Sequence, residues 1–307
     1  MSGVSIVVVS LVGGDALARV LAELARQMQT VESECIVLSR EQGDALAGLQ
    51  QQFAGMRFVE RGGRAVPQAR QHGLTLAQHD VVALLEDSSL PAEGWLQAVA
   101  EAFSHPECIA AGGPVTVAAG LAARYQALAC TEYGRFAPQA FAAMQTGQPA
   151  PAGLTAVARL PGNNLAYRKS RVLAFLQSND EGLIEGALNA WLQQQGQALM
   201  LAPAMQVCYR HADRHGGRLA TRFQHGRLYA GKLAAGQGAA TRFVWALKSL
   251  LLPLVLGLRG AQGMRRLLPA SRWPLVLLWI GLMETAWAAG EFTGYVSGAG
   301  RSLEAWQ

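Results

Sequence analysis

The stretch LLEDSSLPAEGW, residues 84–95, decides the fold of this chain. It includes the end of an apolar run at residues 81–85 that shows no polar alternation, which is typical of a parallel strand covered on both faces. Two carboxylates, Glu86 and Asp87, follow where this strand ends. Open α/β sheets bind ligands at such strand ends, and carboxylate oxygens suit a magnesium or manganese ion. The stretch therefore predicts a ligand site at a sheet edge, unless the two carboxylates only cap the following turn.

The segments before this stretch alternate between strand and helix patterns. An apolar strand at residues 4–9 is followed by an amphipathic helix at 16–29 and a second strand at 34–38, which is a βαβ opening. We read the first strand as buried and not as a signal peptide, because it has no basic region before it. Neither GxGxxG nor GxxxxGK[ST] occurs, which argues against a dehydrogenase or an ATPase. Further expected elements are helices at 44–53 and 67–77 and a strand at 57–59.

Length and charge divide the chain. Its 307 residues allow one large or two modest domains, and we expect an α/β domain at 1–215 and a helical region at 216–307. Residues 1–208 carry a net charge of −4, whereas residues 209–307 carry +9. The four cysteines show neither CxxC nor zinc-ligand spacing, so the sequence favours a reducing cytoplasm. The positive charge needs a partner, either nucleic acid or an anionic lipid surface.

Two apolar stretches in the tail, residues 243–258 and 273–295, favour a membrane and not nucleic acid. Charged residues interrupt both stretches, and Pro253 and Pro274 argue against straight spanning helices. We therefore expect in-plane or re-entrant helices, with buried core helices as the alternative. Basic residues gather at the ends of the stretches, as interfacial anchors do, namely Arg242, Arg259, Arg265, Arg266 and Arg272.

A basic face precedes the apolar stretches. Side chains at spacings of three and four predict one face of a helix, which either lies on anionic headgroups or faces solvent. These residues are Arg218, Arg222, His225, Tyr229 and Lys232.

Four segments together resemble the family 2 glycosyltransferases of the GT-A fold, over residues 4–212. They are VSIVVVS at 4–10, VPQARQHGL at 66–74, the stretch at 84–95, and the pair PGNNLAYRKS at 161–170 with LIEGALNAWLQQQG at 183–196. The resemblance implies a mostly parallel α/β sheet flanked by helices, followed here by a C-terminal helical region that associates with a membrane. The terminal pattern at residues 284–302 is also similar to the tail of membrane-linked members.

The resemblance also implies the site residues. Glu185 takes the position of the catalytic base, while Glu86, Asp87 and His211 take those of ligands to Mg²⁺ or Mn²⁺. Three departures mark this chain: Ser88 stands at the third acidic position, Gln71 replaces an asparagine, and the second strand ends in Ser39 and Arg40 without an aspartate. Donor contacts are implied for Ser10, Arg40, Arg70, Gly162, Asn163 and Asn164.

These features together predict an inverting, metal-dependent transfer of a sugar at the cytoplasmic face of the cell membrane. The expected donor is a nucleotide-diphospho-sugar, with UDP as the expected nucleotide, and the expected acceptor is lipid-linked or a glycan. An anionic membrane surface is an expected partner, and nucleic acid is not. Two alternatives remain open: a degenerate member that binds a nucleotide sugar or glycan without turnover, and a sugar nucleotidyltransferase. The oligomeric state is not predicted.

Overall fold

A computed structural model describes residues 3–179, 181–210 and 219–302 of the chain. It contains two compact units. The first, called here the α/β unit, comprises Met1–Thr116 and Phe136–His211. The second, called the helical unit, comprises Val117–Arg135 and Ala212–Gln307. The segment Val117–Arg135 thus clusters with the C-terminal helices, although it lies inside the α/β unit in sequence.

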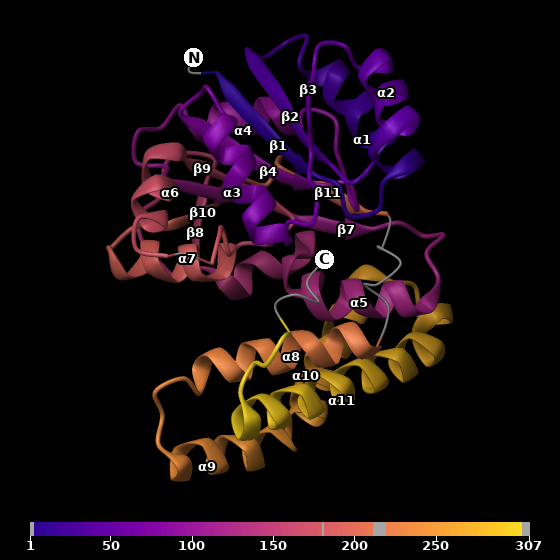
Figure 1. The fold of residues 1–307 in the computed structure, drawn as a ribbon, viewed down its shortest axis with the longest axis vertical. Helices are drawn as coiled ribbons and strands as arrows, with labels where there is room; N and C mark the ends of the chain where they lie inside the picture. The colour runs from indigo at the N-terminus through magenta and orange to yellow at the C-terminus, as the bar shows by residue number, and fades with distance from the viewer. Residues whose placement is uncertain (1–2, 180, 211–218, 303–307) are drawn as a thin grey trace. The chain divides into compact units, whose positions relative to one another are not determined.

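The α/β unit is built on an eight-stranded sheet, ordered β3-β2-β1-β4-β9-β6-β10-β8 (Figure 1). Its first four strands are parallel and almost fully buried except for the edge strand β3, as the unbroken apolar runs predict. The predicted mixture of helices and a large central sheet is confirmed. The strands are β1 (Val4–Val9), β2 (Ser33–Ser39), β3 (Arg57–Glu60) and β4 (Val81–Glu86), and the intervening helices are α1 (Gly14–Gln27), α2 (Gly43–Gln52) and α3 (Val66–Leu76).

The second half of the sheet is mixed and not parallel. Strand β9 (Asn164–Arg168) runs antiparallel between β4 and β6 (Ala110–Gly112), and β10 (Leu199–Leu201) is antiparallel to β8 (Thr155–Val157). A separate three-stranded sheet has the order β5-β11-β7. Its strands are β5 (Ser89–Pro91), β11 (Val207–Tyr209) and β7 (Val115–Val117), and the remaining helices are α4 (Trp95–Ala102), η1 (Gly134–Phe136), η2 (Pro138–Met144), α6 (Lys169–Leu176) and α7 (Glu185–Gln194).

Strand register brings three chain segments to one edge of the sheet. Val9, the last residue of β1, pairs with Glu86, the last residue of β4. Asn164, the first residue of the antiparallel strand β9, pairs with Leu85. The residues that follow β1 and β4 and those that precede β9 therefore meet at the same edge, as the sequence predicts for the carboxyl ends of parallel strands.

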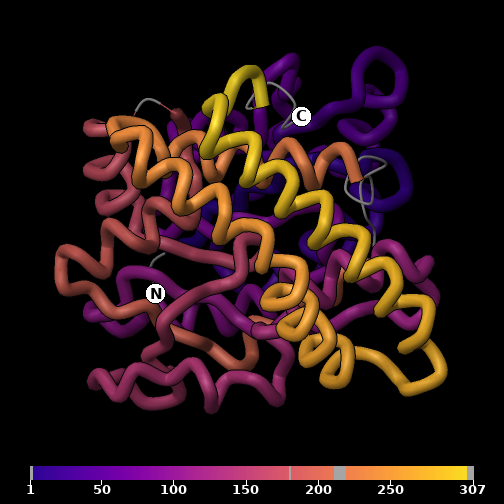
Figure 2. The backbone as a smooth tube through the Cα atoms, turned by 90° about the horizontal axis from the view of Figure 1, so that it is seen from below, coloured from indigo at the N-terminus to yellow at the C-terminus, as the bar shows by residue number. Residues whose placement is uncertain are grey.

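The helical unit packs α5 (Ala123–Tyr133) with the C-terminal helices. Its core combines Cys130 of α5 with Met264 and Ile280. Figure 2 shows α10 and α11, which contact each other, running side by side. The C-terminal helices are α8 (Leu219–Leu233), α9 (Ala239–Ser249), α10 (Leu252–Leu267), η3 (Ala270–Arg272) and α11 (Trp273–Ser297).

Glycines allow α8 and α11 to approach closely. A Cβ atom on Gly290 would lie 2.1 Å from the carbonyl oxygen of Phe223, and one on Gly226 would lie 2.3 Å from that of Trp287. Gly294 makes the same approach one turn further along α11. Small residues on facing helices bring the backbones together in this way. The contact explains why α8 lies along α11.

The two tail prolines do not break their helices, which corrects the expectation drawn from Pro274. Both lie in the first turn of a helix, where the backbone N–H that proline lacks would have no intrahelical acceptor. As a result α11 runs unbroken over 25 residues. By length and composition, Ala270–Ser297 is one helix able to cross a membrane, and α9 with α10 meets the same criterion as a pair bent by 49°. Core helices of soluble proteins also meet this criterion.

Arg222 is not on an exposed basic face, and the prediction that it contacts lipid headgroups was wrong. Its side chain is only 5% exposed. It forms ion pairs with Glu132 of α5 and, at 3.2 Å, with Glu284 of α11. Its guanidinium also lies 4.7 Å from the ring centroid of Trp287. Two carboxylates from other helices of the unit therefore hold this residue inside, while Arg218 lies outside the described residues.

Candidate functional site

Arg70 is the centre of the site at the sheet edge. It lies one turn into α3, with its side chain 4% exposed. One nitrogen, Nη2, donates to Glu86 Oε1 at 2.7 Å and to the carbonyl oxygen of Gly162 at 3.1 Å, while Nη1 donates to the Glu185 carboxylate. The structure thus brings together four of the residues implied by the sequence: Arg70, Glu86, Gly162 and Glu185.

A close backbone contact places Glu185 beside Arg70. Gly182 has φ of +88°, and a Cβ atom there would lie 2.7 Å from the backbone of Pro67 in the first turn of α3. The amide of Leu183 donates to the carbonyl oxygen of Pro67 at 2.9 Å. Helix α7 then begins at Glu185, where the helix dipole favours a carboxylate. Its side chain is 22% exposed, so the carboxylate is held by Arg70 and still open to solvent.

Gly162 leaves room for the Glu185 carboxylate. A Cβ atom at position 162 would lie 2.4 Å from Glu185 Oε1. The glycine of the Gly-Asn-Asn segment before β9 has no side chain, and the Glu185 carboxylate therefore fits beside it. This steric reason for the glycine is visible only in the structure.

Asp87 holds the loop between β1 and α1. Its carboxylate is 1% exposed. It accepts hydrogen bonds from the backbone amides of Leu11, Val12 and Gly13, at 2.8 to 3.1 Å, and from Ser10 Oγ at 2.9 Å. Since Val9 pairs with Glu86, the next residues of the two strands meet here. Ser10, expected at the donor, and Asp87, expected at the metal, are therefore hydrogen-bonded to each other in the structure.

Three further residues fix the same loop. Arg40, which the resemblance placed at the donor, donates to the carbonyl oxygen of Leu11. Arg61 is 7% exposed and donates to the carbonyl oxygen of Ser10 at 2.9 Å. Glu41 accepts from the amide of Gly14 at 2.9 Å. Sequence reasoning missed Arg61 and Glu41, although the glycine-rich segment RGGR at 61–64 was a signal for a special loop there.

The two asparagines of the Gly-Asn-Asn segment point into the protein. Asn164 is fully buried, and its Oδ1 accepts from Trp95 Nε1 at 2.9 Å. Asn163 donates through Nδ2 to Ser89 Oγ at 2.8 Å, and its buried Oδ1 has no hydrogen-bond partner among the described residues. Asn164 thus fixes the Gly-Trp pair at the start of α4. Asn163 retains one acceptor for a further contact.

The carboxylates of Glu86 and Glu185 share one cation, Arg70, at this sheet edge. Burial raises the pKa of Glu86, nearby Glu185 and Asp87 add to this rise, and the Arg70 guanidinium opposes it. Removing that guanidinium would leave Glu86 and Glu185 without the cation that they share. Arg70 is therefore the electrostatic support of the whole edge.

As arranged, the Asp87 carboxylate has no lone pair left for a divalent ion. A carboxylate offers about four lone-pair sites, and the Asp87 carboxylate already accepts from four separate donors. Glu86 accepts from Arg70 through Oε1 and from Ser88 Oγ, at 3.3 Å, through Oε2. No group of three His, Cys, Asp or Glu side chains converges among residues 3–179, 181–210 and 219–302. His211, the third expected ligand, lies outside these residues, so the expected Mg²⁺ or Mn²⁺ site stays a prediction.

One comparison with known proteins matches a segment that contains residues of this sheet edge. Residues 5–148 match the family model described as Glycosyl transferase family 2. None of the curated proteins compared with the chain matches it. The matched residues contain Arg70, Glu86 and Asp87, whereas Gly162 and Glu185 lie beyond them. The ion pair of Arg70 with Glu185 and its hydrogen bond to Gly162 therefore join the matched part to the rest of the α/β unit.

Proposed function

Because residues 5–148 match the family model described as Glycosyl transferase family 2, we propose that the chain moves a sugar from a nucleotide-diphosphate donor to a lipid-linked or glycan acceptor. A UDP-sugar is the proposed donor, and inversion at the anomeric carbon is the proposed stereochemistry. The observation that carries this proposal is the Glu185 carboxylate, which is partly exposed and held by Arg70 at the sheet edge.

In the proposed reaction Glu185 is the general base. The acceptor hydroxyl oxygen forms a bond to the anomeric carbon as the bond from that carbon to the phosphate oxygen breaks. The electron pair of the broken bond leaves with the nucleoside diphosphate, and the hydroxyl proton goes to the Glu185 carboxylate. Attack from the face opposite the leaving group inverts the configuration. A base within about 3 Å of the hydroxyl, directly or through one water, suffices for this step.

Arg70 is a cation at the same sheet edge, and we propose that it opposes the charge of the leaving diphosphate. It is buried, so its charge is screened less than that of a surface arginine. A guanidinium can bind a carboxylate and a phosphate with separate N–H groups. The loop at residues 10–14 is fixed before any donor arrives, through Asp87, Arg40, Arg61 and Glu41. We therefore propose that this edge is preorganised for the donor.

We further propose that the helical unit holds the enzyme at the cytoplasmic face of the cell membrane. Of the large apolar side chains that are exposed in the described chain, all but Leu173 belong to this unit. Leu250, Leu251 and Leu254, around the junction of α9 and α10, are each more than 60% exposed. Large apolar side chains exposed this close together in sequence favour a membrane or protein interface. Exposed arginines on α10 and before α11 support an anionic surface, namely Arg259, Arg265, Arg266 and Arg272.

A donor screen tests the catalytic proposal. Release of nucleoside diphosphate is measured with a panel of nucleotide sugars and a membrane extract as acceptor source. We expect release with one sugar class only, and release that depends on the extract. A parallel assay with a chelator tests the predicted metal use: loss of activity would support it, whereas persistent activity would agree with strand-end carboxylates that are already engaged. Activity that returns only with Mg²⁺ or Mn²⁺ would show that Glu86 and Asp87 rearrange when donor binds.

Vesicle flotation tests the membrane proposal. The full-length protein should float with anionic vesicles, and Leu251→Asp together with Leu254→Asp should reduce the floating fraction. Leu173→Asp is the matched control, since it changes an exposed leucine of the α/β unit. Equal loss of flotation in the control would argue against a specific membrane face.

One observation favours a second function, which is binding without turnover. Both strand-end carboxylates are engaged by protein groups, and Ser88 replaces the third acidic residue. A protein of this kind would bind a nucleotide sugar in calorimetry and release no diphosphate with any acceptor. The same donor screen therefore separates the two functions.

A further inference from the structure

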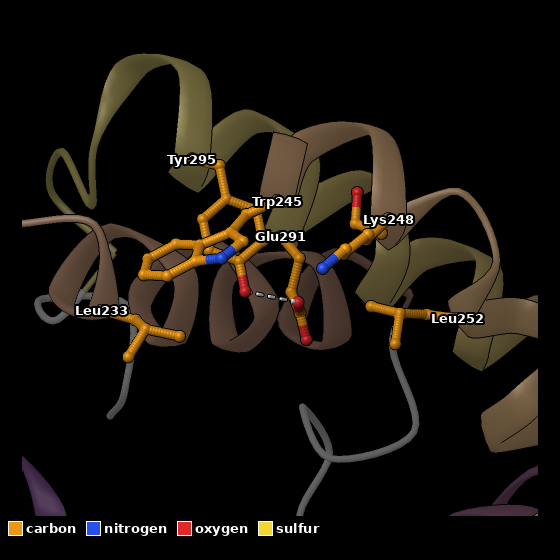
Figure 3. A pocket seen from close by; sticks show the side chains of 7 residues that line it. Leu233, Trp245, Lys248, Leu252, Glu291 and Tyr295 are labelled. Atoms are coloured by element: carbon orange, nitrogen blue, oxygen red, sulfur yellow. Dashed lines mark hydrogen bonds between the residues drawn. The ribbon is translucent and has the colours of Figure 1, made fainter. Parts of the chain in front are cut away.

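A pocket in the helical unit lies far along the sequence from the sheet edge. It is formed by the end of α8, by α9, by the start of α10 and by α11, and its volume is about 160 Å³. Figure 3 shows the side chains that line it, most of them labelled, around one space. A pocket of this size holds far more than one water molecule, so it admits a small polar group. Its labelled lining consists of Leu233, Trp245, Lys248, Leu252, Glu291 and Tyr295.

Glu291 gives the pocket a buried carboxylate. The residue is 6% exposed and accepts hydrogen bonds from Trp287 Nε1 at 2.6 Å and from Tyr295 Oη at 3.1 Å. Both donors are neutral, and Glu291 has no salt bridge within 4.0 Å in the described parts of the chain. Buried carboxylates are ordinarily paired with a cation. A ligand with an ammonium group supplies that cation.

Aromatic rings stand beside this carboxylate. The rings of Trp245 and Tyr295 lie 5.7 Å apart between centroids and are tilted by 60°. Both residues line the pocket, and the faces of such rings attract an ammonium group. A carboxylate and aromatic rings around one space are therefore a binding environment for a cation.

Lys248 adds the opposite charge. It is exposed, and Figure 3 shows its ammonium group and the Glu291 carboxylate directed toward the same space. An ammonium at the rim favours a phosphate. Beside it, Leu250, Leu251 and Leu254 offer apolar surface for aliphatic chains. The pocket thus presents a negative wall, a positive rim and an adjoining apolar surface.

We propose that this pocket binds the zwitterionic headgroup of a phospholipid, one that carries a primary ammonium and a phosphate. The ammonium lies against Glu291 and the rings of Trp245 and Tyr295, and the phosphate lies against Lys248. The aliphatic chains extend over the exposed leucines. The proposal rests on the proposed membrane association and is independent of sugar transfer.

Calorimetry on the full-length protein tests the site with three probes: dihexanoyl phosphatidylethanolamine, dihexanoyl phosphatidylglycerol and free phosphoethanolamine. We expect saturable binding of the first, weaker saturable binding of the free headgroup, and no saturable binding of the glycerol lipid, which lacks the ammonium. Glu291→Gln keeps an acceptor for Trp287 and Tyr295 but removes the charge. It should weaken binding about tenfold or more, as loss of a charged hydrogen bond does.

Controls separate the pocket from general charge effects. Lys248→Met should weaken binding of both amine probes, whereas Arg171→Met removes the same charge from an exposed position on α6 of the α/β unit, outside the pocket lining, and should not. Equal binding of the two lipids would overturn the proposal, as would unchanged binding by Glu291→Gln in a folded protein. Phosphoethanolamine binding that Glu291→Gln abolishes supports the site even if vesicle flotation fails, which distinguishes this proposal from membrane association.

Discussion

Arg70 in α3 and Glu185 at the start of α7 form an ion pair across 115 positions of sequence. The second branch of the same guanidinium holds Glu86 at the end of β4. One arginine thereby positions both a strand-end carboxylate and the proposed base. This relationship explains why the edge depends on α3, which itself has no other proposed chemical role.

Replacement of Arg70 should destabilise the protein as well as inactivate it. Arg70→Met leaves Glu86 and Glu185 without their shared cation in a buried setting, and breaking a buried pair costs about 3–5 kcal/mol. Chemical denaturation of the full-length protein measures this loss. Arg26→Met is the control, because Arg26 pairs with Glu23 at the surface, where an ion pair contributes little to stability. Similar losses for the two variants would contradict the assignment of Arg70.

Asp87→Asn should loosen the loop between β1 and α1. The amide keeps the size of the carboxylate but turns an NH₂ group toward some of the backbone amides that Asp87 now accepts from. Hydrogen exchange of the amides of Leu11, Val12 and Gly13 should therefore accelerate, and donor affinity should fall. Unchanged exchange at these three amides would show that Asp87 does not hold the loop in solution.

Gly162→Ala should separate activity from stability. The added Cβ would lie 2.4 Å from Glu185 Oε1, which is the end of a flexible side chain and can move aside. We expect a stability change under about 1 kcal/mol and a rate loss of about 10²-fold from a misplaced base. Steady-state kinetics and thermal unfolding measure the two effects.

Gly186→Ala, one residue after the proposed base, is the matched control. A Cβ there meets no atom within 4 Å. Activity should persist, and stability should rise by about 0.4–1 kcal/mol because the alanine restricts the unfolded chain. An equal rate loss in both variants would mean that Gly162 does not act through Glu185.

The helical unit should lose stability in mild acid. Burial lowers the pKa of His225 from 6.5 to about 4, with Arg222 adding to the fall and Glu132 opposing it. The unfolded chain therefore binds a proton on this histidine first as the pH falls. The stability it contributes is complete above about pH 6.5 and is lost as the pH falls through about 4. Urea unfolding at several pH values should show this loss.

His225→Gln should remove that part of the pH dependence. His105→Gln, a change in the α/β unit, is the control and should leave the acid-dependent unfolding of the helical unit as in the wild type. If His225→Gln unfolds with the same pH dependence as the wild type, His225 is not the responsible group.

Local patterns predict the sheet well and its polar contacts poorly. Strand β1 has the predicted bounds, and Glu86 and Asp87 follow the predicted strand, because apolar runs report burial directly. The partners of Asp87 were not predictable in this way, since they are backbone amides more than seventy positions away. No residue type marks a loop whose amides point at a distant carboxylate.

Helix faces were harder to assign than helices. The spacing of Arg222 fits an exposed basic face, but Glu132 and Glu284, from two other helices, hold it inside. Pro274 was taken to argue against a straight spanning helix, whereas its place in the first turn makes it compatible with α11. Both outcomes depend on tertiary partners and on the exact helix start, which a single sequence does not contain.

The most direct test of the central claim is the transfer rate of Glu185→Gln, measured together with its donor affinity by calorimetry. Glutamine keeps the size of the side chain and can still accept from Arg70, but it cannot take the acceptor proton. We expect the rate to fall about 10²- to 10⁴-fold with donor affinity unchanged. A variant that transfers sugar at the wild-type rate, or that loses donor binding and turnover together, would contradict the role of Glu185 as the base.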